Sequence, residues 1–115
     1  MIEFSPNLLQ RLPSTDQFVT IGEGWIPLVE KLNKDIAEFL PNYKILQIKE
    51  KFGGLRFYVA YDESFTDLQI AEMEALIKKA EMESFKICDV CGAVGKIIST
   101  SPYWLATRCE QHLVG

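Results

Sequence analysis

The chain of 115 residues is predicted to form one α+β domain, in which two amphipathic helices pack on an antiparallel β-hairpin and a second hairpin follows. Three observations predict this arrangement. Apolar residues recur every three or four positions over residues 25–40. Residues 44–61 alternate apolar and polar side chains around two glycines. A helix-capping motif then opens a long segment that ends near residue 85.

The composition is that of a folded protein, with 48% hydrophobic and 24% charged residues. The first residues lack the basic segment and long apolar run of a signal peptide. No apolar stretch approaches the ~20 residues that span a bilayer. We therefore expect a cytoplasmic protein with reduced cysteines and no membrane partner.

Charge is distributed unevenly along the chain. The net charge is −4, but residues 43–61 carry four bases and one acid, a net charge of +3. The flanking residues 1–42 and 62–87 carry net charges of −3 and −4. The overall negative charge disfavours nucleic-acid binding, which usually requires a basic footprint. The basic segment between two acidic ones is nevertheless a candidate binding surface.

Residues 1–23 form a lead-in to the predicted core. Ser5 and Pro6 are a favourable N-cap and first-turn pair for a short helix that ends before Pro13. Gly22 and Gly24 then mark a loop.

The predicted core covers residues 24–87 and consists of helix, hairpin and helix. The first helix runs from Trp25 to Leu40, where Pro27 is tolerated only in the first turn and Pro41 ends the helix. The second begins with a capping box at Thr66 and Gln69. The residues expected to form its buried stripe are Ile70, Met73, Leu76, Ile77, Ala80 and Phe85.

The hairpin is predicted to turn at Gly53 and Gly54, a pair suited to a two-residue type I′ or II′ turn. This register places Lys51 opposite Arg56. Because side chains alternate between the faces of a strand, each face has its own set of residues. The face expected to pack on the helices carries Leu46, Ile48, Phe52, Leu55, Phe57, Val59 and Tyr61. The opposite face carries Lys49, Lys51, Arg56 and Tyr58.

The cations of the hairpin have two interpretations. The common one is solvated charge on an exposed sheet face, which hinders aggregation. Directly opposed cations are unfavourable, however, as Lys51 and Arg56 would be in this register. The functional alternative is an anion-binding patch of Lys49, Lys51 and Arg56 with Tyr58 between them. Its ligand would be an acidic protein, a phosphate group or a nucleic-acid backbone.

Glu50 falls among the apolar residues of the hairpin, where a lone carboxylate is costly. It can lie at the rim near the tip and pair with a cation or a donor at a helix end. A β-bulge can move it to the other face. The third reading is a buried acid or base with a raised pKa, which requires an adjacent pocket.

The C-terminal segment, residues 88–115, uses every cysteine of the chain and its single histidine in two pairs. Cys88 and Cys91 are separated by two residues, as are Cys109 and His112. Two short strand-like runs, residues 96–100 and 103–107, lie between the pairs and predict a hairpin that brings them together. Three thiolates and one imidazole predict a tetrahedral zinc site. Cys88 and Cys91 would lie in its knuckle, a tight turn that carries two ligands, and the zinc would hold the C-terminal module together.

The alternatives explain these residues less well. A thioredoxin-like redox pair is expected between a strand and a helix, whereas Cys88 and Cys91 follow a helix. Disulfides would leave one cysteine over, and a core histidine without ligands does not explain the matched spacing. Four protein ligands leave no coordination position for water, so we expect the Zn2+ to be structural.

Three aromatic residues outside the hairpin attract attention. Trp25 follows the loop of Gly22 and Gly24, where it is either core or an anchor. Tyr103 and Trp104 are neighbours in a strand, so one of them should face solvent. An exposed aromatic residue beside a zinc module is a plausible contact residue. We therefore add Trp104 to the candidate contact residues Lys49, Lys51, Arg56 and Tyr58.

Several of these motifs together resemble a family of small uncharacterised proteins from bacterial and phage genomes. The matching stretches lie at residues 24–28, 47–59 and 80–84, followed by the two ligand pairs. The order of knuckle, hairpin and second ligand pair also resembles a treble-clef or zinc-ribbon module. The family resemblance implies no reaction. A phage or prophage setting would imply an accessory role in which the protein binds and modulates a host protein.

These observations favour a small non-enzymatic module that binds a protein partner. No nucleophile–histidine pair is available, because zinc uses the only histidine, and Gly53 and Gly54 lack the following helix of a phosphate-binding loop. Nucleic-acid binding through Lys49, Lys51 and Arg56 is the alternative, and salt-dependent affinity would reveal it. An enzyme that uses Glu50 is the third hypothesis.

Overall fold

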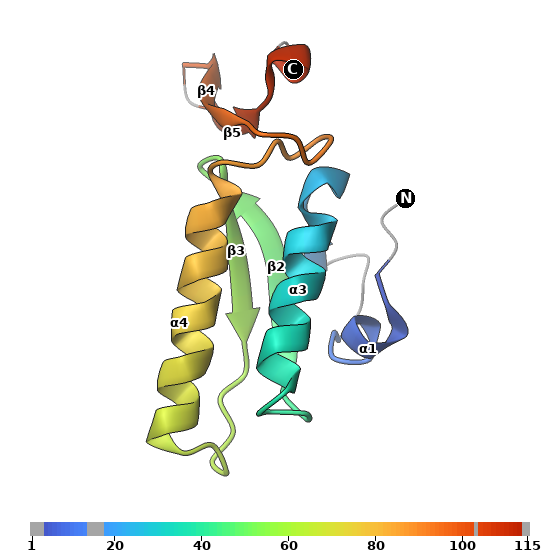
Figure 1. The fold of residues 1–115 in the computed structure, drawn as a ribbon, viewed down its shortest axis with the longest axis vertical. Helices are drawn as coiled ribbons and strands as arrows, with labels where there is room; N and C mark the ends of the chain where they lie inside the picture. The colour runs from blue at the N-terminus through green and yellow to red at the C-terminus, as the bar shows by residue number, and fades with distance from the viewer. Residues whose placement is uncertain (1–3, 14–17, 103, 114–115) are drawn as a thin grey trace.

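The computed structural model describes residues 4–13, 18–102 and 104–113 and has the predicted α+β architecture. Helices α3 (Ile26–Ala37) and α4 (Asp67–Ser84) lie side by side on one face of the sheet that contains β2 (Ile45–Lys51) and β3 (Gly54–Val59) (Figure 1). The second hairpin, β4 (Lys96–Ser101) and β5 (Trp104–Arg108), lies beyond the tip of the first, at one end of the molecule.

The hydrophobic core fills the space between the two helices and the sheet. Its fully buried side chains come from the lead-in, from both helices and from both strands of the first hairpin: Leu8, Trp25, Val29, Ile36, Ile45, Ile48, Leu55 and Met73. Trp25 is therefore a core residue, at the end of the short 3-10 helix η1 (Glu23–Trp25) that precedes α3. No helix in the described ranges is long and apolar enough to cross a membrane.

The short helix in the lead-in is confirmed as α1 (Pro6–Leu9). The Ser5 hydroxyl accepts a hydrogen bond from the Leu8 N–H at 3.2 Å, as an N-cap does. The Ser5 N–H and hydroxyl also donate to the Glu30 carboxylate at 2.6 and 2.8 Å. These bonds attach the lead-in to α3.

A buried polar network connects the lead-in to α3 and to the residues that follow it. Arg11 is only 4% exposed, and its guanidinium lies 4.5 Å from the centroid of the Tyr43 ring. It donates to the carbonyl oxygens of Pro41 and Tyr43 at 2.8 and 3.0 Å. The Tyr43 hydroxyl in turn donates to Asn33 on α3 at 2.5 Å. The sequence pattern gave no sign of this network, because an isolated arginine is usually exposed.

Helix α4 begins at the predicted capping box and ends at Ser84, next to the predicted end near residue 85. The Thr66 hydroxyl accepts from the Gln69 N–H at 3.1 Å, and the Gln69 side chain accepts from the Thr66 N–H at 2.9 Å. Of its predicted stripe, Met73 and Ala80 are buried. The other members, Ile70, Leu76, Ile77 and Phe85, are partly buried.

The sheet contains a parallel strand that the sequence did not predict. Strand β1 (Val19–Thr20) pairs with Ile48 and Lys49 of β2, so the strand order is β1-β2-β3 and the sheet is mixed. The two predicted hairpins are antiparallel, and β1 adds a parallel pair to the first of them. A strand of two residues is too short to produce an alternating pattern.

The first hairpin turns one residue earlier than predicted. Lys51 pairs with Gly54, which leaves Phe52 and Gly53 in the turn. Their φ angles of 55° and 85° are those of a type I′ turn. In this register Lys49, and not Lys51, lies opposite Arg56. The glycine pair misled the prediction because Phe rarely adopts a positive φ.

Three residues that were assigned to the apolar face are exposed instead. The register shifts between Ile45 and Gln47, and this bulge turns Leu46 toward solvent. Phe52 is exposed in the turn, and Tyr61 lies beyond the end of β3. The other predicted core residues of this face, Ile48, Leu55, Phe57 and Val59, are buried.

The outer edge of β3 is covered by side chains of α4. The Leu55 N–H donates to the Ser84 hydroxyl at 2.9 Å, and the Phe57 N–H donates to the Glu81 carboxylate at 3.0 Å. An uncovered strand edge is a template for pairing with another chain. These two bonds therefore close the half of the edge nearest the hairpin tip to strand addition.

Candidate metal centre

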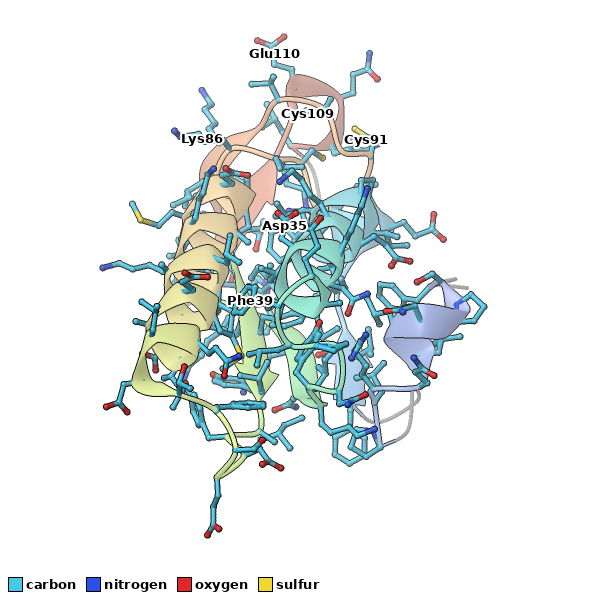
Figure 2. All side chains as sticks on the ribbon, turned by 60° about the horizontal axis from the view of Figure 1, so that its bottom comes forward. Asp35, Phe39, Lys86, Cys91, Cys109 and Glu110 are labelled. Carbon is cyan, nitrogen blue, oxygen red and sulfur yellow. The ribbon has the colours of Figure 1, made fainter. Side chains whose placement is uncertain are left out.

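The two ligand pairs meet at the end of the molecule that carries the second hairpin. The ligand atoms of Cys88, Cys91, Cys109 and His112 all lie within 4.8 Å of one another, so this group can hold a metal ion. Figure 2 shows Cys91 and Cys109 at the same end of the molecule as Lys86, away from Phe39. Cys88 follows the last turn of α4, and His112 belongs to the 3-10 helix η2 (Glu110–His112).

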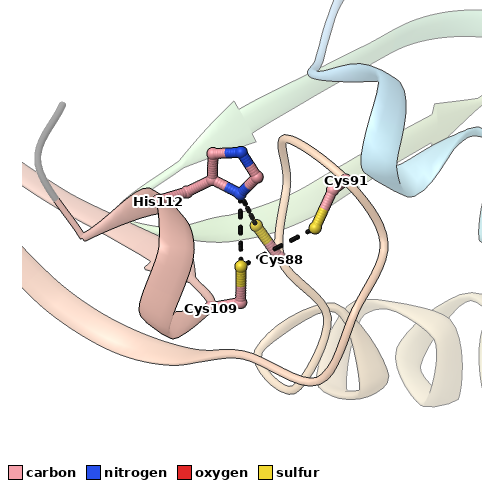
Figure 3. A group of neighbouring side chains, drawn as sticks. All are labelled: Cys88, Cys91, Cys109 and His112. Atoms are coloured by element: carbon pink, nitrogen blue, oxygen red, sulfur yellow. Dashed lines mark hydrogen bonds between the residues drawn. The ribbon is translucent and has the colours of Figure 1, made fainter.

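Three of the separations between the ligand atoms fit a tetrahedral site. Sγ of Cys91 lies 3.7 Å from Sγ of Cys109, and Nδ1 of His112 lies 3.6 Å from Sγ of Cys88 and 3.2 Å from Sγ of Cys109. Metal–sulfur bonds of about 2.3 Å would give S···S edges of about 3.8 Å in a tetrahedron. Figure 3 shows Nδ1 of His112 turned toward the cysteines and the other ring nitrogen turned away.

The first pair lies in a tight knuckle. The Gly92 N–H donates to the Cys88 carbonyl at 2.9 Å, and the Cys88 N–H donates to the Ala93 carbonyl at 2.8 Å. Gly92 has a φ of 85°, so the turn needs a residue that tolerates the left-handed region.

The knuckle also stabilises the thiolate form of Cys88. Burial raises the pKa of this thiol, but hydrogen bonds to its sulfur outweigh burial and lower the pKa to about 6. The donors include three backbone N–H groups, those of Cys109, Cys91 and Val90. The thiolate is the form that binds metals.

An ion pair joins the two halves of the site. Asp89 in the knuckle and Arg108, which precedes Cys109, approach to 2.7 Å and are both largely buried. The Asp89 N–H donates to the Thr107 carbonyl at 3.0 Å, so the backbone also connects the knuckle to β5. This ion pair and this hydrogen bond connect the two ligand pairs through contacts between protein groups.

The loop of Gly22 and Gly24 packs directly on the knuckle. The Gly24 N–H donates to the Asp89 carbonyl at 3.0 Å. A Cβ atom on either glycine would overlap backbone atoms of Cys88 or Asp89. The indole N–H of Trp25 donates to the Ile87 carbonyl at 2.8 Å. Both glycines therefore serve close backbone approach, which the sequence showed only as a loop signal.

The tip of the first hairpin packs on the other side of the same module. The Thr107 hydroxyl donates to the Gly53 carbonyl at 2.6 Å in a buried contact. The neighbouring Gly54 faces the Phe85 ring so closely that a Cβ atom would overlap it. The glycine pair thus fits between the end of α4 and β5. We refer to the contacts of Gly22, Gly24 and Trp25 with residues 87–89, together with this tip contact, as the interlock.

Glu50 caps the hairpin turn. Its carboxylate is half-buried and accepts a hydrogen bond from the Gly53 N–H at 2.6 Å. This matches the prediction that Glu50 lies at the rim near the hairpin tip. Its partner is a backbone N–H of the turn, however, and not a donor at a helix end. The bulge lies at Leu46 and leaves Glu50 on the apolar face. Since the turn occupies this carboxylate, its geometry gives no support to a role as a free acid or base.

The basic residues of the hairpin gather on one face of the sheet, as the alternation predicts. Lys49 lies opposite Arg56, but each leans toward another group. The Lys49 ammonium lies 5.6 Å from the centroid of the Tyr58 ring, and the Arg56 guanidinium lies 3.8 Å from the Glu81 carboxylate. The Lys51 ammonium lies 5.5 Å from the centroid of the Phe52 ring.

The aromatic residues of the second hairpin are only partly described. Trp104 is 61% exposed on β5, in agreement with the expectation that one of the two aromatics faces solvent. Tyr103 lies outside the described residues. Phe52 is a surface residue that the predicted register assigned to the core. The signal for the turn was the pair of glycines that follows it, and that pair placed the turn one residue too late.

Comparisons with protein-family models, with curated proteins and with solved structures found no match to this chain.

Proposed function

We propose that the protein is a small zinc-stabilised, non-enzymatic module that binds a protein partner. In this proposal Zn2+ at Cys88, Cys91, Cys109 and His112 holds the second hairpin against the core. The observation that carries the proposal is the interlock, because it makes the loop before α3 and the tip of the first hairpin depend on the backbone around the metal centre.

The chemistry of the ligands favours zinc. Three thiolates and one imidazole in a tetrahedral arrangement form a structural zinc site. The four protein ligands fill the coordination shell, so no position remains for a reacting water. With a neutral histidine the site would carry a charge of about −1 and add no basic surface.

The second hairpin needs such a centre because it has little core of its own. Strand β4 is exposed or partly exposed along its length. Among the described residues of the module, 88–102 and 104–113, the buried side chains are Cys88, Ala106, Thr107 and Cys109. Zinc binding in zinc-finger peptides contributes about 10–16 kcal/mol to folding, enough to hold such a segment.

The wider setting is part of the same proposal. The order of knuckle, hairpin and second ligand pair supports a relation to treble-clef or zinc-ribbon modules. The resemblance of the hairpin motif to small bacterial and phage proteins supports an accessory protein of a phage or prophage that modulates a host protein. A cytoplasmic location would keep the three cysteines reduced.

Metal analysis tests the proposal. We expect one Zn2+ per chain by native mass spectrometry, and a melting temperature that falls by about 10 °C or more after chelation. Cys91→Ser should lose the metal and show the same fall, whereas Val90→Ser in the same knuckle should retain both metal and stability. A metal-free chain with an unchanged melting temperature after strict chelation would contradict the proposal.

A further inference from the structure

We propose that the exposed face of the first hairpin binds an acidic segment of a partner protein, with Phe52 as a contact residue. We call this surface the basic–aromatic face, and its residues are Lys49, Lys51, Phe52, Arg56 and Tyr58. The inference rests on the proposed interaction function and deepens it by naming the surface and the chemistry of the partner.

Phe52 is poorly explained by the stability of the fold. Among the described residues it is the only non-glycine residue with a positive φ, and its side chain is 64% exposed. Both central positions of a type I′ turn favour Asn, Asp or Gly. An L-residue with a large side chain is strained there, because its Cβ atom crowds the following carbonyl oxygen. Such an outlier with an exposed aromatic ring indicates a role in contact with another molecule.

The charge of this face favours an anionic partner. Among the described residues, no carboxylate oxygen lies within 4.0 Å of the ammonium nitrogen of Lys49 or Lys51, and Arg56 has only the 3.8 Å contact with Glu81. Glu50 is engaged by the Gly53 N–H in the turn. A positive face on a protein of net charge −4 therefore selects an acidic ligand by charge complementarity.

A groove beside this face distinguishes a protein from a nucleic acid. It has a volume of about 540 Å³ and runs between β3 and α4, and Arg56 and Tyr58 line it together with the exposed side chain of Met82. An apolar side chain of the partner fits such a site. The carboxylates of Glu74 and Glu81 and the ammonium of Lys78 also line the groove, so it suits an uncharged apolar side chain of the partner better than an anionic group. The observations thus favour an acidic protein segment that carries an apolar residue.

Selection from a displayed library of random short peptides tests this inference with the full, zinc-loaded chain. We expect enrichment of peptides that combine several Asp or Glu residues with one aromatic or branched apolar residue. A synthetic peptide from the selection should bind more weakly as salt is increased. No enrichment, or enrichment without an excess of acidic residues, would overturn the inference.

Three variants of the protein locate the binding surface. Reversal of Lys49, Lys51 and Arg56 to Glu should weaken binding of the synthetic peptide at least about tenfold. The matched control reverses Lys34, Lys86 and Lys96, which are exposed outside the first hairpin, and should change affinity by less than about twofold. Phe52→Asn should weaken binding about fivefold or more and leave the melting temperature equal or higher, because Asn suits the turn. Equal affinity of Phe52→Asn and the original protein would exclude Phe52 from the contact.

Two further outcomes separate this inference from its alternatives. A single-stranded oligonucleotide that binds more tightly than the selected peptides, and that loses affinity on the same charge reversal, would overturn the inference in favour of nucleic-acid binding. Zinc content is measured on the same preparations. A zinc-loaded, folded chain without peptide binding would reject the acidic partner but keep the structural role of the metal, whereas a folded chain without zinc would reject that role.

Discussion

Glu50 and Phe52 show how neighbouring residues of one turn can have different roles. The Glu50 carboxylate accepts the Gly53 N–H and so satisfies a donor within the turn. Phe52 buries little and occupies a backbone conformation that suits Asn or Gly better. The Glu50 carboxylate therefore has a structural role in the turn. The exposed Phe52 ring is available for contact with a partner protein.

Tyr43 provides a test of the buried polar network through pH. Burial raises the pKa of this phenol above its ordinary value of 10.0. The neutral form is therefore favoured in the folded state, and its contribution to stability is complete below pH 10 and is lost as the pH rises above that value. We expect the free energy of unfolding to fall there with a component of about 1.4 kcal/mol per pH unit from this residue.

Urea titrations across this alkaline range measure the effect. Tyr43→Phe should remove this component of the slope, whereas Tyr58→Phe at an exposed site should leave it in place. If the original protein and Tyr43→Phe lose stability with the same slope above pH 10, Tyr43 is not held neutral by the fold.

At the scale of elements, the glycines of two loops determine how the parts fit together. Gly24 contacts backbone atoms of the knuckle, whereas Gly54 contacts the side chain of Phe85. A second substitution cannot remove an overlap between a new Cβ atom and backbone atoms. It can remove an overlap with a side chain by shortening that side chain. The two positions should therefore respond differently to the same change.

We expect Gly24→Ala to lower the free energy of unfolding by more than about 2 kcal/mol, because the Cβ would force the loop away from Cys88 and Gly92. Gly54→Ala should also destabilise the protein, but Phe85→Ala should recover part of that loss in the double variant. Denaturant unfolding of the single and double variants measures this coupling. Additive effects of Gly54→Ala and Phe85→Ala would show that the ring does not pack on the glycine.

Sequence patterns predicted elements whose causes are local. The capping box fixed the start of α4, and the spacing of the cysteines and His112 identified the four residues that the fold brings together. The turn at Phe52 and Gly53 was missed because the glycine pair satisfies the ordinary rule for a hairpin better than Phe does. Strand β1 was missed because two residues form no pattern.

At the scale of the whole molecule, the important contacts join segments that are distant in the sequence. Trp25 bonds to Ile87, and Gly53 bonds to Thr107. Such pairs leave no periodic signal, since each depends on how the completed helices, sheet and knuckle pack together. The interlock could therefore not be predicted from the sequence, although its glycines and its tryptophan stood out individually.

In the proposed function, this architecture would make the candidate metal centre a support for surfaces outside its own hairpin. The loop of residues 22–25 contacts the knuckle on one side, and the tip of the first hairpin contacts β5 on the other. The basic–aromatic face ends at that tip. Loss of the metal should therefore loosen the proposed binding surface while the helical core remains better protected.

Hydrogen exchange with and without zinc shows whether the metal supports these segments. We predict that chelation accelerates amide exchange in residues 22–25 and 53–55 by about tenfold or more, with a smaller change in the middle of α3. Cys91→Ser should give the same pattern without a chelator. Unchanged exchange in both segments after the metal has been removed would contradict the claim that the metal centre holds the interlock together.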